Sequence, residues 1–217
     1  MNTFPLELKF RVFYYLTRRS CIKFILLDNL YSLSKNELIL LKRTDAIDKM
    51  HHAIKFGYTN LLQLLFDKGY KGDLYWASKC GNEFCVKKIL LHENNNTLNK
   101  KDKIGKTALV YAVQNGHTKI VKLLIKAGAD LSIRYSLKQT ILDHAAYTGS
   151  SKITQLLIDH GADVNAQNMW GWTPLHVAYF KRRKNIVRIL LANNADPNIR
   201  TYDWNNKPSD LVVDLTI

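Results

Sequence analysis

Residues 173–176 read Thr-Pro-Leu-His, and the chain repeats around this stretch with a period of 33 residues. Thr107, Thr140 and Thr173 stand at this interval. So do the triplets Gly-Ala-Asp at 128–130 and 161–163, and Asn-Ala-Asp at 194–196. A fixed period of this length is typical of a solenoid, in which each unit buries its apolar surface against its neighbours. The sequence therefore predicts an elongated stack of similar units.

Each unit of the repeat predicts two helices joined by a turn. Thr173 can cap the N-terminus of the first helix, and Pro174 suits the first helical position, where its missing N–H would have no partner. The second helix carries an apolar stripe, as in Ile-Val-Lys-Leu-Leu-Ile at 120–125. One unit cannot bury this stripe, whereas a stacked neighbour can. We interpret His176 as a structural hydrogen-bonding group and not as a catalyst.

These features resemble the ankyrin repeat family, whose Thr-Pro-Leu-His signature stands intact at 173–176. The resemblance covers about residues 46–217 and is strong from residue 98 onward. By this register there are about five repeats, of which the first two are irregular and the full ones span 102–134, 135–167 and 168–200. Residues 201–217 are expected to cap the stack. The resemblance implies an all-α solenoid of helix–turn–helix units with short β-hairpin loops, used for protein–protein interaction.

Residues 1–45 lack the repeat and predict a small module of three short helices. The opening Pro-Leu-Glu-Leu at 5–8, with the apolar residues that follow it, resembles an F-box. Thr-Arg-Arg-Ser at 17–20 departs from the Asp-Pro-x-Asp turn of that family. The alternative is that this module only caps the first repeat. The resemblance implies that five residues bind a Skp-type ubiquitin ligase adaptor: Pro5, Leu8, Val12, Tyr15 and Leu16.

Charge and composition restrict the classes of function. The chain has 217 residues and a net charge of +14, from 32 Lys and Arg against 18 Asp and Glu. This balance favours acidic partners. The excess is spread evenly over both halves, which argues against a dedicated nucleic-acid-binding arm. No apolar run approaches the ~20 residues of a membrane-spanning helix, and no signal peptide is evident. We therefore expect a monomer in the cytoplasm without a membrane anchor.

The sequence lacks the motifs of catalysis and of metal or phosphate binding. The three cysteines, Cys21, Cys80 and Cys85, fit no disulfide framework and no zinc site, and they are interpreted as small buried apolar residues. We expect a non-catalytic binding protein with no cofactor and no metal.

The densest charge run is Lys181, Arg182, Arg183 and Lys184, at the turn between the two helices of the repeat at 168–200. Two interpretations are open: a solvated basic turn, and a nuclear-import signal or anion-binding patch. Glycines stand one and two periods before Arg182, at positions 149 and 116. This pattern predicts a left-handed backbone at Arg182.

Large apolar residues occupy the loop tips and the exposed side of the first helices, where ankyrin proteins bind their partners. Tips of this kind are usually small and polar. A contiguous apolar patch marks an interaction site, and we expect it to bind a protein with an apolar anchor and acidic groups. The candidate partner-binding residues are Leu137, Tyr147, Met169, Trp170, Trp172, Phe180, Tyr202 and Trp204.

The leading functional hypothesis is an F-box substrate receptor that recruits a target protein to a cullin-RING ubiquitin ligase through its ankyrin repeats. The alternative is a stand-alone ankyrin scaffold or inhibitor. Chains that combine an F-box with ankyrin repeats resemble bacterial or viral effectors that act on host proteins. For an effector, the expected location is the host cytoplasm, with entry into the nucleus if residues 181–184 are an import signal.

Overall fold

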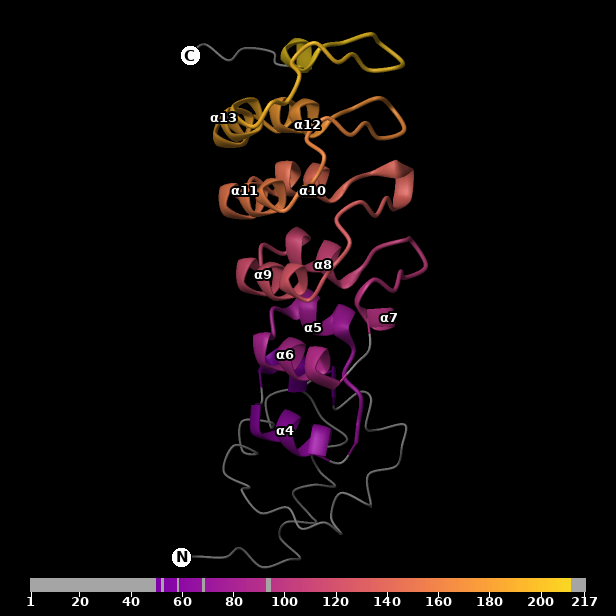
Figure 1. The fold of residues 1–217 in the computed structure, drawn as a ribbon, viewed down its shortest axis with the longest axis vertical. Helices are drawn as coiled ribbons and strands as arrows, with labels where there is room; N and C mark the ends of the chain where they lie inside the picture. The colour runs from indigo at the N-terminus through magenta and orange to yellow at the C-terminus, as the bar shows by residue number, and fades with distance from the viewer. Residues whose placement is uncertain (1–49, 52, 58, 68, 93–94, 212–217) are drawn as a thin grey trace, which may run out of the picture.

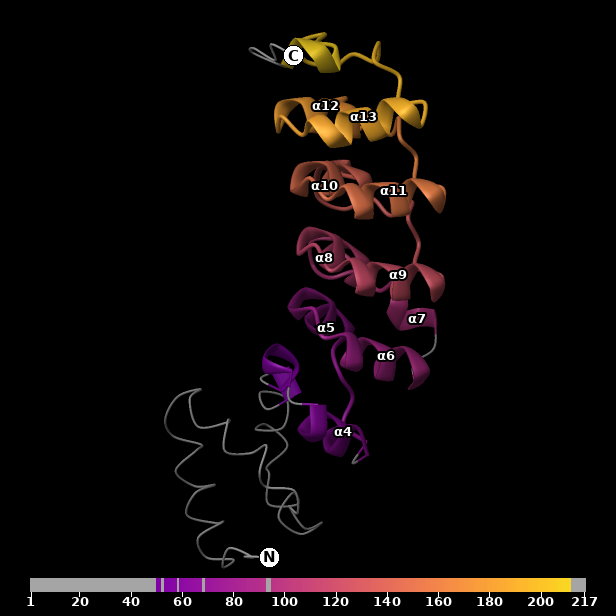
Figure 2. The ribbon, with the colours of Figure 1, turned by 90° about the vertical axis from the view of Figure 1, so that its left-hand side faces the viewer.

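The computed structural model describes residues 50–51, 53–57, 59–67, 69–92 and 95–211. These residues form an elongated stack of helix pairs, with the connecting loops on one side (Figures 1 and 2). The predicted all-helical solenoid is confirmed for this part of the chain. The expected F-box-like module at residues 1–45 lies outside the described residues.

The helices alternate between two layers of the stack. The first helices of successive units contact one another in one layer, and the second helices do so in the other. Residues 50–51 and 53–56 are also helical. The elements in chain order are α4 (Thr59–Asp67), α5 (Leu74–Cys80), α6 (Glu83–His92), α7 (Asn95–Leu98), α8 (Ala108–Gln114), α9 (Thr118–Lys126), the 3-10 helix η2 (Ser136–Lys138), α10 (Ile141–Thr148), α11 (Ser151–Asp159), α12 (Pro174–Phe180), α13 (Lys184–Ala192) and the 3-10 helix η3 (Pro208–Leu211).

The apolar core lies between the two layers and runs the length of the stack. The first helices contribute small residues such as Ala112, Ala145 and Ala178, all fully buried, which allow the layers to approach closely. On the second helices, the predicted apolar stripe faces this core and is buried. Each large side chain in it contributes about 1.5–3 kcal/mol by leaving water. Its largest buried members are Ile120, Leu124, Ile153, Leu157, Ile186 and Leu190.

The capping threonines begin the first helices, but not all in the same way. Thr173 and Thr140 each form a capping box with the third residue of the helix, His176 and Asp143. Thr107 also stands at the N-cap of its helix, but its side chain makes no capping bond. The third residue of α8 is Val110, which has no polar atom to complete the box. In this unit the threonine therefore holds the N-cap position without the side-chain bond that Thr140 and Thr173 make.

The β-hairpins expected between the units are reduced to tight turns, because no described residue forms a strand. In the loop before α12, for example, Asn168 N donates to Trp172 O at 2.9 Å. The next backbone groups bond sideways to the neighbouring loop instead of extending the hairpin. These inter-loop bonds recur once per unit: Ser136 N to Ile104 O (3.2 Å), Met169 N to Leu137 O (3.0 Å) and Tyr202 N to Trp170 O (3.0 Å).

The predicted left-handed backbone at Arg182 is confirmed. Its φ is +52°, against +72° at Gly116 and +79° at Gly149. In the loop before α10, Leu137 (+62°) and Lys138 (+55°) are also left-handed. Such angles cost a residue with a Cβ about 1–2 kcal/mol each.

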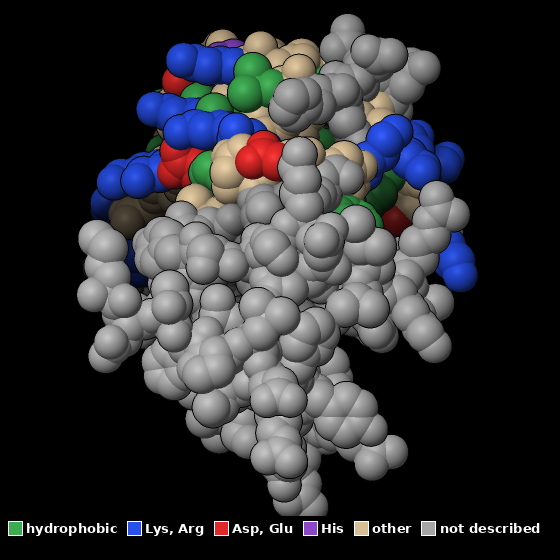
Figure 3. Space-filling view, turned by 90° about the horizontal axis from the view of Figure 1, so that it is seen from below, with side chains coloured by type: hydrophobic (Ala, Val, Ile, Leu, Met, Phe, Trp, Pro, Cys, Tyr) green, Lys and Arg blue, Asp and Glu red, His purple; other side chains and the backbone are tan. Residues whose placement is uncertain are grey.

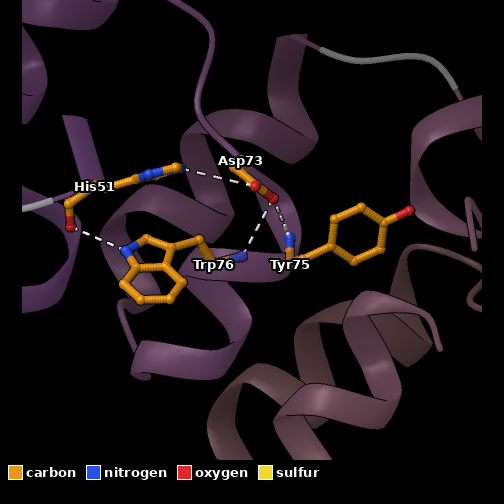
Figure 4. Close-up of polar contacts among 4 residues, drawn as sticks. All are labelled: His51, Asp73, Tyr75 and Trp76. Carbon is orange, nitrogen blue, oxygen red and sulfur yellow. Dashed lines mark hydrogen bonds and ion pairs between the residues drawn. The ribbon is translucent and has the colours of Figure 1, made fainter. Parts of the chain in front are cut away.

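The start of the stack departs most from the regular repeat. Only residues 68–73 separate α4 from α5, which agrees with the irregular first repeats that the sequence predicts. Asp73 replaces the capping threonine, and its Oδ1 accepts from the backbone N of Tyr75 (2.8 Å) and of Trp76 (3.2 Å). Trp76 Nε1 donates to His51 O at 2.9 Å, and the His51 ring lies beside Asp73 (Figure 4). These contacts connect the helical turn at residues 50–51 to the start of α5.

Candidate functional site

A groove of about 480 Å³ lies over α10 and α12, between the loop before α12 and the loop that follows α13. Its walls are largely aromatic, and polar groups line it both on the α10 side and in the loops. The lining residues are Gln139, Asp143, His144, Tyr147, Asn168, Trp170, Trp172, Val177, Phe180, Lys181, Asp203 and Trp204.

Five of the eight candidate partner-binding residues meet in this groove. Trp204 is 72% exposed, Tyr147 and Phe180 are each 52% exposed, and Trp170 is 37% exposed. Trp172 is half-buried and packs edge-on against Phe180, with 5.3 Å between ring centroids. The sequence places these rings in three repeats, and the stack brings them together.

The other three candidates, Leu137, Met169 and Tyr202, are exposed but do not line the groove. All three take part in the inter-loop bonds through their backbones. Gly171 allows the close approach of the last loop, because a Cβ there would lie 2.7 Å from Tyr202 N. These residues therefore lie on the loop edge beside the groove.

Asn168 positions the two tryptophans of the loop before α12. Its side chain is buried, and Oδ1 accepts from the backbone N of Trp170 at 3.0 Å and of Trp172 at 3.1 Å. Sequence reasoning missed Asn168, because an asparagine in a turn has the same sequence signature whether or not it supports a binding surface.

Lys181 is the member of the basic run that lines the groove. Its ammonium lies 4.2 Å from the centroid of the Tyr147 ring and 5.2 Å from that of Phe180, in cation–π contact with both. Arg182, Arg183 and Lys184 are exposed outside the groove, and Arg183 Nη2 donates to Tyr147 O at 3.4 Å. A positive charge thus lies on the aromatic wall.

The polar side of the groove carries Asp143, whose side chain is 2% exposed. Its Oδ2 accepts from Thr140 N at 2.8 Å. Its Oδ1 is buried and makes no hydrogen bond within the described part of the chain. Burial raises the pKa of this carboxyl to about 7, and the hydrogen bonds from Thr140 offset the effect only in part.

His144 lies next to Asp143 and lines the same side. Its ring is stacked on Tyr135, and Gln114 Nε2 donates to its Nε2 at 2.6 Å. Burial lowers the pKa of His144 to about 4, with a smaller effect from Lys106. The imidazole is therefore neutral at physiological pH, and of these two neighbouring side chains only Asp143 changes its charge near neutrality.

His176 has the structural role that the sequence suggests. It is fully buried, and its Nδ1 accepts from Thr173 N at 3.1 Å. Its Nε2 donates to Asn206 O at 3.2 Å in the following loop. Desolvation lowers its pKa, which suits a neutral ring that joins two units.

Among the residues that the structure describes, no three His, Cys, Asp or Glu side chains are grouped so that they could hold a metal ion. Cys85 is buried and Cys80 half-buried, and both are free thiols. None of the helices in this part of the chain is long and apolar enough to cross a membrane.

Comparison with known proteins agrees with the architecture. A family model described as ankyrin repeats in three copies matches residues 50–135 and 131–201. No curated protein sequence matches the chain. Ankyrin repeats indicate a protein–protein interaction scaffold, and proteins built from them are generally non-catalytic. The repeats occupy most of the chain, from the first described turn to the last loop, and the chain therefore belongs to the ankyrin repeat family.

Proposed function

We propose that this scaffold binds its partner protein in the groove over α10 and α12. The observation that carries the proposal is the convergence of five aromatic side chains from three repeats on one groove. Exposed apolar patches of this kind mark interaction sites, and Trp and Tyr are enriched among the residues that dominate binding energy. Asn168 fixes the backbone of the loop that carries two of these rings, so less ordering of the loop is needed on binding.

The charges of the molecule favour a partner that carries acidic groups beside its apolar anchor. Lys181 lies on the groove wall, and Arg182 to Lys184 follow directly. In the view along the stack, Lys and Arg outnumber Asp and Glu on the visible described surface (Figure 3). Such complementarity speeds association at low salt. We therefore propose a protein segment with an aromatic or aliphatic anchor next to Asp or Glu.

Selection from a random peptide display library on the full chain tests this proposal. Enriched peptides should pair an aromatic or aliphatic residue with Asp or Glu. Trp170→Ala should weaken the binding of a selected peptide by about 30-fold, which corresponds to ~2 kcal/mol. Tyr202→Ala is the matched control, because Tyr202 is exposed in the neighbouring loop and lies outside the groove. Equal losses in both variants, or none in either, would contradict the assignment.

The finer proposal is that residues 1–45 dock on a Skp-type adaptor and make the chain a ubiquitin ligase substrate receptor. The F-box-like sequence at residues 5–16 supports it. The ligase would supply the chemistry, and the groove would raise the local concentration of target lysines near the ubiquitin-carrying enzyme.

A pulldown with a purified Skp-type adaptor tests the ligase role. The full chain should bind, and Leu8→Ala combined with Pro5→Ala should abolish binding. Trp170→Ala should leave adaptor binding unchanged, because the groove is distant in sequence from residues 1–45. Absence of binding by the unmodified chain at micromolar concentration would leave the alternative, a stand-alone scaffold or inhibitor that masks its target.

A further inference from the structure

We propose that the groove binds an anionic segment more tightly while Asp143 carries a proton, so that binding weakens as the pH rises and this carboxyl ionises. This inference rests on the proposed function of the groove and adds its regulation. It requires a carboxyl next to the groove, an environment that keeps this carboxyl protonated, and a bound group whose charge interacts with it.

Asp143 occupies the repeat position that histidine holds in the Thr-Pro-Leu-His signature at 173–176. Asp143 lies 33 residues before His176, at the same position of the capping box. His176 uses its second ring nitrogen to donate to Asn206 O in the next loop. At the preceding junction Asp143 Oδ1 makes no hydrogen bond within the described residues, although it is buried. This junction therefore lacks a counterpart of the hydrogen bond that joins α12 to the last loop, and one buried carboxyl oxygen, Asp143 Oδ1, lies beside the groove without a hydrogen bond among the described residues.

Asp143 changes its charge near neutral pH because water does not reach it. Burial raises its pKa to about 7, and the hydrogen bonds of Thr140 and the charge of Arg134 offset this only in part. His144 is neutral in this range, and Tyr135 stays protonated because burial raises its pKa as well. The other titratable groups on the helices around Asp143 are Tyr147 on α10 itself, Tyr111 on α8, Lys152 and Asp159 on α11, and His176 and Tyr179 on α12. The adjoining turns and loops add Lys106, Lys138, Lys181 and Asp203.

The groove favours an anion over a cation. Lys181 already places an ammonium on the rings of Tyr147 and Phe180, so a second cation would meet a like charge. With Asp143 protonated, the fixed charges in the lining are Lys181 and the exposed Asp203. When Asp143 ionises, a buried negative charge repels the bound anion with little screening. By linkage, the bound anion in turn raises the proton affinity of Asp143.

A fluorescence titration with anilinonaphthalene sulfonate tests the inference on the full chain. This dye joins apolar rings to a sulfonate that stays ionised at every pH used, and it matches the proposed occupant in both respects. We expect its Kd to rise about tenfold between about pH 6 and pH 8, as for an interaction worth one pKa unit.

Two substitutions isolate the acid. Asp143→Asn keeps an oxygen for Thr140 N and removes the ionisation, so dye binding should become independent of pH and stay as tight as in the unmodified chain at pH 6. Asp159→Asn is the matched control on α11, where the carboxylate is exposed, and it should keep the original profile. The same pH profile in Asp143→Asn as in the unmodified chain, or an affinity that rises with pH, would overturn the inference.

Trp204→Ala separates this inference from the proposed function. Trp204 is 72% exposed, so its truncation leaves the core intact. If Trp204→Ala binds the dye as well as the unmodified chain, the groove is not the binding site and the proposed function fails too. If Trp204→Ala binds weakly while the profile of the unmodified chain is flat, the groove stands and the proton dependence alone is refuted.

Discussion

One position of the repeat holds three different side chains in successive units, and each joins its neighbours differently. Val110 is apolar and buried, Asp143 completes a capping box with one oxygen left over, and His176 bonds both to its own cap and to the next loop. The same backbone therefore supports an apolar contact, a buried acid and a hydrogen-bonded link. Stability and pH response are set separately at each junction.

Asp143→Asn should change how stability depends on pH. The carboxyl has an ordinary pKa of 3.8 when unfolded and about 7 when folded, so folding takes up a proton between these values. Its contribution to stability is present at low pH and is lost as the pH rises toward 7. The unfolding free energy of the variant, relative to the unmodified chain, should rise by roughly 2 kcal/mol between about pH 5 and pH 8.

Urea unfolding at several pH values measures this difference. His144 has a lowered pKa and contributes in the opposite sense, with stability lost as the pH falls from 6.5 toward 4. Because both proteins carry His144, its effect cancels in the comparison. A difference that does not change with pH would show that Asp143 is ionised in the folded protein throughout.

Arg182→Gly should stabilise the protein. Arg182 has a φ of +52° at a position where two other units have glycine. Removing the Cβ relieves the left-handed strain, and the greater freedom of glycine in the unfolded chain offsets part of this, which leaves a gain of about 0.5–1 kcal/mol. Thermal unfolding measures it. Arg183→Gly is the matched control, with a φ of −89°, and it should give no gain.

At the scale of the elements, the loops and helices differ in how far the sequence determines them. The period of 33 residues predicts the helix pairs, the cap at Thr173 and the left-handed turn at Arg182, because each depends on residues close in sequence. It also predicts that aromatic side chains gather at the loops. It does not reveal that Asp143 Oδ1 makes no hydrogen bond among the described residues, since that depends on how the following unit packs against α10. Nor does it reveal that the loops bond to each other instead of forming strands.

Asp73→Ala should loosen the start of α5. The Asp73 carboxylate caps this helix in the absence of the usual threonine, and losing such a cap costs about 1 kcal/mol. The ion pair with His51 is partly exposed and adds little. Thermal unfolding should show the loss in Asp73→Ala and only a small one in Asp73→Asn, which keeps an oxygen to accept from Tyr75 N. An equal loss in both variants would mean that charge, and not capping, is what matters.

At the scale of the whole molecule, the extensive contacts between described elements all join adjacent units, and damage should therefore stay local. Removing residues 201–217 uncovers α12 and takes away Asn206, the acceptor of His176. Hydrogen exchange should show faster exchange in α12 and α13, while α8 and α9 keep their protection. Equally faster exchange in all four helices would mean that the stack unfolds as one cooperative unit.

The bonds between successive loops have a mechanical consequence. They join Ile104 to Ser136, Leu137 to Met169, and Trp170 to Tyr202, so the loop edge is a chain of links in series along the long axis. Tension applied to the two ends loads every link, and the weakest junction opens first while the others hold. The junction beside Asp143 lacks the bond that His176 makes to the following loop, and it should therefore open under less tension than the junction after α12. A partner bound across the groove would hold the two units together and oppose this opening.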